Sequence, residues 1–126
     1  MAFPELIKKK IKGFGYAFQG LALMLRDYNA KIHLPAAVLV IAAAWYFGVS
    51  KPEWLWLLWS IALMWITETF NSALEKVVDL ASPDYHELAK QAKDLSAAAV
   101  LLSLFFAATV GIMVLGPYCL RLFSSF

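Results

Sequence analysis

The N-terminal segment, residues 3–28, carries apolar residues at every third or fourth position, with lysines between them. This spacing indicates a helix with one apolar face. A basic amphipathic helix suits the surface of a membrane, so the pattern predicts a surface helix over residues 3–28. The alternative is a helix whose apolar face packs on the rest of the protein. The apolar stripe consists of Phe3, Leu6, Ile7, Ile11, Phe14, Phe18, Leu21 and Leu25.

Three longer apolar stretches follow, at residues 32–49, 54–81 and 95–115. Each is long enough to cross a hydrocarbon core of about 30 Å as a helix. The first and third contain no Asp, Glu, Lys or Arg. The second begins as an apolar helix and becomes polar at Glu68, which predicts that it extends out of the membrane into the cytoplasm.

Turn-forming residues separate these stretches. Gly48 and Pro52 indicate a turn after the first span, and Pro83 ends the second. Gly116 and Pro117 predict the end of the third. The fold expected is therefore an all-α membrane protein with one domain over residues 1–126, made of a surface helix and three transmembrane helices.

Composition agrees with a membrane protein. Hydrophobic residues make up 62% of the chain and charged residues 16%, whereas an average soluble domain has about 25% charged residues. The net charge of +2 does not indicate a nucleic-acid partner. Cys119 is the only cysteine, so it cannot form a disulfide within the chain, and we assign it no function.

The distribution of positive charge predicts how the chain crosses the membrane. In a three-span arrangement, all of the 11 Lys and Arg residues except Lys51 and Arg121 fall on one side. Because cytoplasmic flanks carry the excess of positive charge, the N-terminus is expected in the cytoplasm and the C-terminus outside. The expected location is the cytoplasmic (inner) membrane, as a multi-pass protein.

Acidic and amide residues occupy one face of the second span. Glu68, Asn71, Glu75 and Asp79 are spaced by three or four residues, which places them on the same side of a helix. Ionisable groups within a span are costly, so their presence favours a functional site. Their oxygens suit magnesium. The alternative is a helix end whose acids form ion pairs with lysines.

A second polar group follows in the loop and at the start of the third apolar helix. It contains Asp84, Tyr85, His86, Lys93 and Asp94. These residues are candidates for binding phosphates, although Lys93 and Asp94 also fit a positively charged flank with an acid at a helix start. No P-loop motif is present in the sequence. A cation-binding channel or transporter subunit, with the acidic face lining an ion path, is the alternative function, and a structural scaffold is a third.

Three sequence segments carry a resemblance to a known family. The segments are GYAFQG, ETFNSALEKVVDL and DYHELAKQAKD. Together they resemble the bacterial diacylglycerol kinase and undecaprenol kinase family from about Lys9 to about Gly116. The resemblance implies a homotrimer of three-span subunits with an N-terminal surface helix. It also implies that the protein phosphorylates the hydroxyl of a membrane lipid with magnesium and ATP, at sites shared between neighbouring subunits.

The resemblance also implies functions for individual residues. Glu68 resembles the catalytic glutamate, acting as general base toward the lipid alcohol. Glu75 resembles a magnesium ligand, and Asp27 lies nearest to a second ligand that is a glutamate in the best-studied branch. Lys9 replaces an arginine, which keeps the charge but loses the bidentate fork. Asn71 and Asp79 match supporting positions. The implied nucleotide contacts are Lys9, Tyr16, Asp27, Glu75, Asp84, Tyr85, His86, Lys93 and Asp94.

The acceptor lipid is open at this point, between diacylglycerol and undecaprenol. The segment NAKIH, residues 29–33, resembles the undecaprenol kinase branch more than the diacylglycerol branch.

Overall fold

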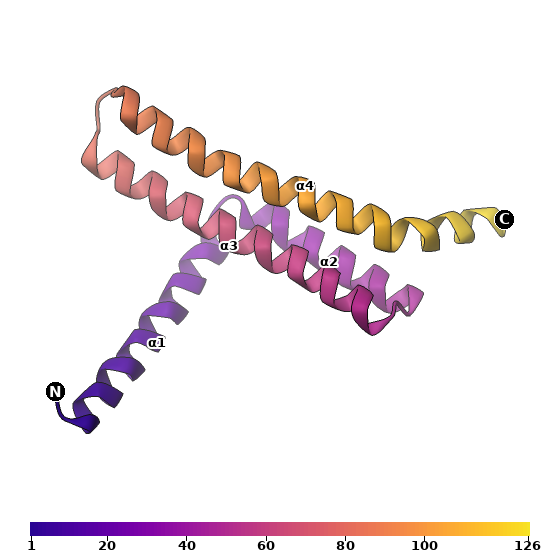
Figure 1. Ribbon diagram of the computed structural model, residues 1–126, viewed down its shortest axis with the longest axis horizontal. Helices are drawn as coiled ribbons and strands as arrows, with labels where there is room; N and C mark the ends of the chain where they lie inside the picture. The colour runs from indigo at the N-terminus through magenta and orange to yellow at the C-terminus, as the bar shows by residue number, and fades with distance from the viewer. The chain divides into compact units, whose positions relative to one another are not determined.

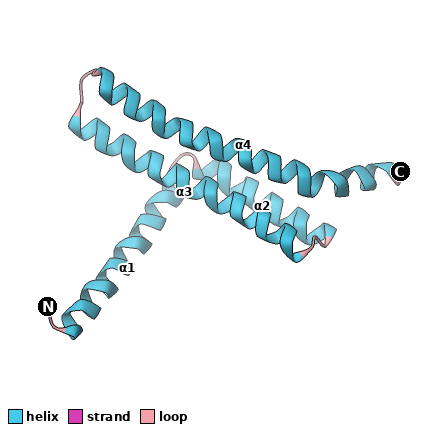
Figure 2. Ribbon diagram, in the orientation of Figure 1, coloured by secondary structure: helices cyan, strands magenta, loops and turns pink.

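The computed structural model describes all 126 residues and contains four α-helices joined by short loops (Figure 2). The helices are α1 (Phe3–Arg26), α2 (Ala30–Phe47), α3 (Lys51–Ala81) and α4 (Glu87–Ser124). The all-helical fold predicted from the sequence is confirmed. The chain divides into two compact units, Met1–Leu34 and Pro35–Phe126, which are described separately.

The first unit consists mainly of α1. The helix begins with Pro4 in its first turn, and the Glu5 carboxylate accepts a hydrogen bond from the Ala2 N–H at 3.3 Å. No residue of α1 is buried, so its apolar stripe is exposed within this unit. Asp27 takes an extended backbone conformation. The helix therefore ends at Arg26, slightly before the predicted residue 28.

In the second unit, a tight turn joins α2 to α3. Gly48 has φ +60°, a left-handed conformation that glycine adopts without steric cost. The Val49 N–H then donates to the carbonyl of Ala44 at 3.2 Å, which closes the end of α2. Ser50 caps α3: its side chain accepts from the Glu53 N–H, and the Glu53 carboxylate accepts from the Ser50 N–H at 3.0 Å. The predicted turn after the first span is confirmed.

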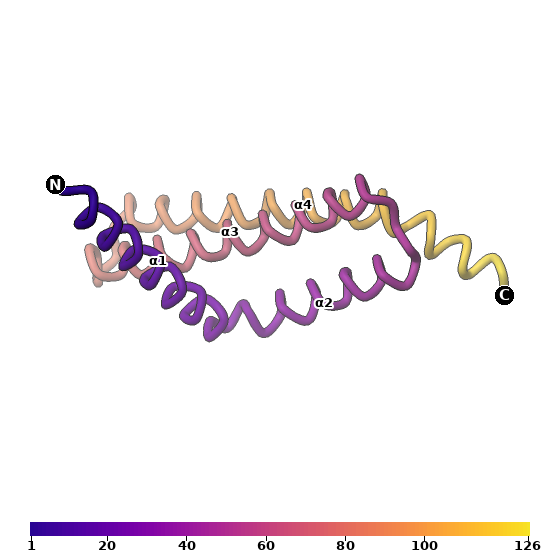
Figure 3. The backbone as a smooth tube through the Cα atoms, turned by 90° about the horizontal axis from the view of Figure 1, so that it is seen from below, coloured from indigo at the N-terminus to yellow at the C-terminus, as the bar shows by residue number.

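Helices α3 and α4 form an antiparallel pair that runs side by side (Figure 1). The tube view in Figure 3 shows α2 approaching this pair toward the α2–α3 turn. An apolar cluster holds the three helices together there, because its buried members come from α2, the turn, α3 and α4. These members are Ala44, Val49, Leu57, Val110 and Val114.

The end of α4 differs from the prediction. Gly116 and Pro117 do not stop the helix, which continues to Ser124. A proline inside a helix removes one backbone donor and bends the axis, and apolar spans tolerate it when neighbouring groups compensate. α4 changes direction near its yellow end in Figures 1 and 3. Tyr118 fixes this last part of α4 by stacking on Phe47, with ring centroids 5.5 Å apart.

Two helices, α2 and α4, are long and apolar enough to cross a membrane. Helix α3 is not one of them. It contains four of the five tryptophans, which contribute little to mean hydropathy and favour the membrane interface, and it also contains Glu68. Two candidate spans thus agree with the predicted segments 32–49 and 95–115, and a membrane span over residues 54–81 stays a prediction.

Candidate active site

The polar face of α3 runs from a buried part to an exposed part. The side chains of Glu68 and Asn71 are buried, with exposed fractions of 9% and 8%. One and two turns further along the helix, Glu75 and Asp79 are exposed. The spacing seen in the sequence therefore produces a graded site, in which one carboxylate is shielded by protein and two are accessible.

Residues of α4 bind the same face of α3. The Ser96 hydroxyl donates to Asn71 Oδ1 at 2.6 Å, and Asn71 Nδ2 donates to Glu75 Oε1 at 3.2 Å. One turn closer to the loop, the Lys93 ammonium forms an ion pair with the Asp79 carboxylate. Antiparallel packing of α3 on α4 thus brings together four of the residues predicted from the sequence: Asn71, Glu75, Asp79 and Lys93.

Lys93 is the cation of this group, and it precedes the predicted span at residues 95–115. Its hydrogen bond to the Asp79 carboxylate is the main cause that raises the pKa of Lys93 above its usual value of 10.5. The nearby Glu75 carboxylate acts in the same direction. Lys93 therefore remains positively charged at physiological pH, which suits a group that would contact phosphate.

The loop residues between α3 and α4 also shape the start of α4. His86 is the N-cap, and its Nδ1 accepts a hydrogen bond from the Leu88 N–H at 3.1 Å. The Tyr85 hydroxyl donates to the Glu87 carboxylate at 2.7 Å, which raises the pKa of the Tyr85 phenol. These contacts give His86 and Tyr85 a structural function, and both side chains are exposed. Their contact with a nucleotide stays a prediction.

Asp84 and Asp94, the remaining acids of this region, are both exposed. The backbone carbonyl of Asp84 accepts a hydrogen bond from the Ser82 hydroxyl at 2.9 Å. Asp94 forms an ion pair with Lys90 at 2.6 Å, one turn away on α4. Lys90 thus pairs with one of the acids on this surface.

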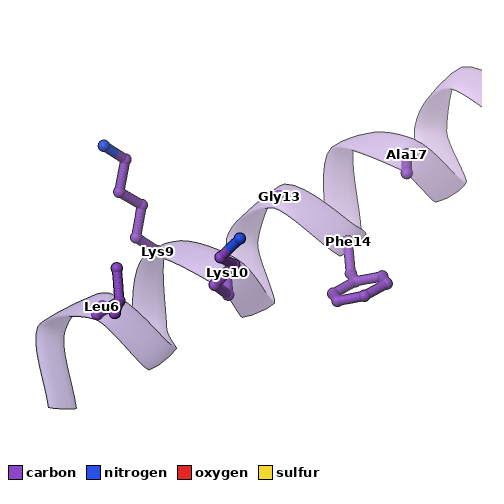
Figure 4. Close-up of a pocket in the computed structure, with 6 residues that line it drawn as sticks. All are labelled: Leu6, Lys9, Lys10, Gly13, Phe14 and Ala17. Carbon is purple, nitrogen blue, oxygen red and sulfur yellow. The ribbon is translucent and has the colours of Figure 1, made fainter. Parts of the chain in front are cut away.

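The predicted residues of α1 lie on one face of that helix. Lys9, Gly13 and Tyr16 are spaced by four and three residues, so they point in similar directions. Figure 4 shows the long side chain of Lys9 extending away from the helix, and Lys9 and Gly13 are among the residues that line a hollow on this surface. A β-carbon at Gly13 would meet nothing within 4 Å, so this surface is open within the first unit.

Asp27 lies at the end of α1, in the first unit. Its side chain is half-buried, and its backbone carbonyl accepts from the Ala30 N–H at 3.1 Å. Lys9, Tyr16 and Asp27 thus belong to one unit, and the acidic face of α3 with Lys93 belongs to the other.

No group of three or more His, Cys, Asp or Glu residues in the single chain is arranged to hold a metal ion. Magnesium does not require such a cage, because it is usually held by one or two carboxylates, nucleotide phosphates and water. The exposed carboxylate of Glu75, fixed through one oxygen by Asn71, suits that kind of coordination.

Sequence reasoning missed the hydroxyl groups that join α3 to α4. Ser96 contacts Asn71, and Ser103 forms a hydrogen bond with Thr67 at 2.8 Å between the hydroxyl oxygens. The available signal was their position: Ser96 lies three residues and Ser103 ten residues after Lys93, on nearly the same face of the helix.

Comparison with known proteins decides between the remaining interpretations. The profile of the family described as prokaryotic diacylglycerol kinase matches residues 15–115. The chain belongs to this family. The matched range includes the polar face of α3, the start of α4, Tyr16 and Asp27, so every predicted site residue except Lys9 lies within it.

Individual relatives cover most of the chain. The diacylglycerol kinase of Escherichia coli (strain K12) is 33% identical over 117 residues, which are 92% of this chain and 90% of that protein. The undecaprenol kinase of Bacillus subtilis (strain 168) is 30% identical over 112 residues, 88% and 91% of the two chains. The diacylglycerol kinase of Synechocystis is 40% identical over 111 residues, 86% of this chain and 63% of that one.

Family membership confirms the expected enzyme class, a lipid kinase associated with a membrane. It favours this interpretation of the acidic face over a channel or transporter subunit.

Proposed function

We propose that this protein transfers the γ-phosphoryl group of ATP to the primary hydroxyl of a membrane lipid, with magnesium as cofactor. The observation that supports this most is the arrangement along α3. A buried carboxylate at Glu68 and exposed acids at Glu75 and Asp79 lie on one face, beside the cationic Lys93. Such a graded site can receive a lipid hydroxyl at one end and a charged nucleotide at the other.

Glu68 is the proposed general base. Its carboxylate takes the proton of the lipid hydroxyl while that oxygen forms a bond to the γ-phosphorus. The bond between the γ-phosphorus and the bridging oxygen of ATP breaks in the same displacement, and ADP leaves with the electron pair. Burial of Glu68 supports this function, because few waters are then available to compete with the lipid hydroxyl.

Glu75 and Asp27 are the proposed magnesium ligands. Bound magnesium would neutralise charge on the phosphates during transfer. Glu75 is suited to this because Asn71 holds its carboxylate in place while its surface stays accessible. Asp27 is proposed from the resemblance to the family, and its shorter side chain stands where the best-studied branch has a glutamate.

The proposed nucleotide contacts follow the resemblance to the family. Lys93 would bind a phosphate while Asp79 orients its ammonium group. Lys9 and Tyr16, on the open face of α1, are proposed as nucleotide contacts from the resemblance to the family. Further contacts are proposed for Asp84, Tyr85, His86 and Asp94.

The proposed setting is the cytoplasmic membrane. α1 lies on the membrane surface, and α2, α3 and α4 cross it with the N-terminus in the cytoplasm and the C-terminus outside. A homotrimer with shared sites is proposed from the resemblance to the family. Exposure of most apolar side chains in the single chain supports both lipid contact and association with further subunits.

Purified protein in detergent micelles tests the proposal. Radiolabelled γ-phosphate should move from ATP to an added lipid alcohol, and chelation of magnesium should stop the transfer. If no lipid becomes labelled in a preparation that remains folded and homogeneous, the proposed function is wrong. Hydrolysis of ATP without labelled lipid would also contradict it.

The acceptor is proposed to be diacylglycerol or undecaprenol, the lipids in the names of the relatives. Both are primary alcohols. The resemblance of residues 29–33 to the undecaprenol kinase branch predicts a higher kcat/KM for undecaprenol. A competition assay that offers both lipids to one preparation measures this directly, and preferential labelling of diacylglycerol would reverse the assignment.

A further inference from the structure

Asn71 is held between two polar partners that come from different helices. Its Oδ1 accepts a hydrogen bond from the Ser96 hydroxyl of α4 at 2.6 Å, and its Nδ2 donates to Glu75 Oε1 of α3 at 3.2 Å. The Asn71 side chain is buried, with 8% exposed, whereas Ser96 is half-buried and Glu75 is exposed. The three residues form one chain of hydrogen bonds from the interior of the helix pair to the proposed magnesium ligand.

The Glu75 carboxylate determines which group donates and which accepts in each of these hydrogen bonds. An ionised carboxylate only accepts hydrogen bonds, so Glu75 must face the NH₂ group of Asn71. The amide oxygen of Asn71 then faces Ser96, and it also only accepts. Ser96 must therefore give its single hydroxyl proton to Asn71.

A competing acceptor lies close to the same hydroxyl. The Lys93 carbonyl is 2.9 Å from Ser96 Oγ, in the preceding turn of α4. The distance to Asn71 Oδ1 is shorter, at 2.6 Å. A serine in a helix normally donates back to such a carbonyl, so the contact with Asn71 draws the proton away from the ordinary local bond.

We propose that Ser96 is a positioning residue, which acts through Asn71 to hold the Glu75 carboxylate in the orientation that binds the magnesium–nucleotide complex. This rests on the proposed function of Glu75. Without the Ser96 hydroxyl, the buried oxygen of Asn71 loses its donor. The Asn71 amide can then rotate to find another donor for its oxygen. Glu75 loses the N–H that orients its carboxylate.

Ser96→Ala is the direct test, and Ser103→Ala is its matched control. Both changes remove a hydroxyl of α4 that contacts α3, but Ser103 contacts Thr67 and not Asn71. Ser96→Ala should raise the half-saturating magnesium concentration roughly threefold to tenfold, the effect of one lost neutral hydrogen bond. Ser96→Thr, which keeps the hydroxyl, should restore most of the affinity, and Ser103→Ala should leave it unchanged.

A binding measurement separates this proposal from the proposed reaction. Calorimetry with a non-hydrolysable ATP analogue, repeated over a range of magnesium concentrations, should show the same weakening in Ser96→Ala without any turnover. Equal magnesium dependence in wild type and Ser96→Ala would overturn the positioning function, even if the wild type phosphorylates lipid normally. An equal weakening in Ser103→Ala would overturn it too, because the effect would then follow from helix packing in general.

The double variant Ser96→Ala, Asn71→Ala provides a second criterion. If Ser96 acts through Asn71, the double variant should bind the magnesium complex no more weakly than Asn71→Ala alone. Additive losses would show that Ser96 acts by another route. Thermal unfolding of each variant in micelles identifies any protein that has lost its fold, and Ser96→Cys, which retains a weak donor, replaces Ser96→Ala if that occurs.

Discussion

The two ends of the α3–α4 pair each contain a glutamate of α3, but only one of the two is bonded directly to a residue of α4. At one end, Glu53 Oε1 accepts from the Ser50 N–H at 3.0 Å and from the Tyr118 hydroxyl at 2.8 Å. At the other end, Glu75 accepts from Asn71, and its side chain is exposed beside a region of further charges.

The first end forms a capping cluster, which consists of Ser50, Glu53, Tyr118 and Arg121. Its carboxylate begins a helix and ties the end of α4 to the start of α3. The Arg121 guanidinium lies 5.8 Å from the centre of the Tyr118 ring, so its charge is directed at a neighbour within the cluster. The two carboxylates differ in what remains for a ligand: Glu53 is engaged by Ser50 and Tyr118 of its own chain, whereas Glu75 keeps an exposed side chain.

The largest difference in activity is expected between two glutamates of α3, Glu68 and Glu53, when each is changed to glutamine. Glu68→Gln should lower kcat for lipid phosphorylation by at least roughly 100-fold, because an amide cannot accept the proton of the lipid hydroxyl. Glu53→Gln is the control on the same helix, and it should retain activity within about twofold. Initial rates at saturating ATP measure both, and near-normal turnover in an assembled Glu68→Gln protein would rule out Glu68 as the base.

The next largest difference is expected in the KM for ATP, when the cation at each end of the α3–α4 pair is replaced by methionine. Lys93→Met should raise the KM for ATP roughly tenfold, because a charge-assisted contact with phosphate is lost, while Arg121→Met should leave it unchanged. Lys93→Arg keeps the charge and should fall between Lys93→Met and wild type. Steady-state kinetics over a range of ATP concentrations measure these values, and an unchanged KM in Lys93→Met would contradict a phosphate contact.

The smallest effect is expected in the capping cluster. Tyr118→Phe removes the donor to Glu53 but keeps the ring that stacks on Phe47. The Tm in micelles should fall by no more than about 5 °C, with lipid kinase activity unchanged. Tyr46→Phe is the control, since Tyr46 also contacts Phe47 by its ring, with centroids 5.1 Å apart, and is otherwise exposed. A large loss of activity in Tyr118→Phe would mean that this end also serves the reaction.

Much of the fold could be predicted from the sequence, because helix periodicity and turn residues are local signals. The ends of α3 follow from Ser50 with Pro52 and from Pro83. The continuation of α4 through Pro117 could not be predicted from local residues, and in the structure this end of α4 contacts Glu53, 65 residues earlier in the chain, through the Tyr118 hydroxyl.

The candidate site shows the same division. The one-face arrangement of Glu68, Asn71 and Glu75 is local to α3, so spacing alone predicts it. The contacts of Ser96 and Lys93 with that face depend on how α4 packs against α3, which the spacing within either helix does not contain. Lys93 could be proposed as a ligand from its charge and from the resemblance, whereas the only signal for Ser96 was its position on the helix relative to Lys93.

The most direct test of the account is to locate the nucleotide on the protein. Photolabelling of the assembled protein with an azido analogue of ATP, followed by mass spectrometry, identifies the peptides that contact it. The account predicts magnesium-dependent labelling of peptides within residues 68–94, prevented by excess ATP and reduced in Lys93→Met. Competable labelling at the capping cluster, with residues 68–94 unlabelled, would contradict the central claim that the exposed polar end of the α3–α4 pair binds the phosphate donor.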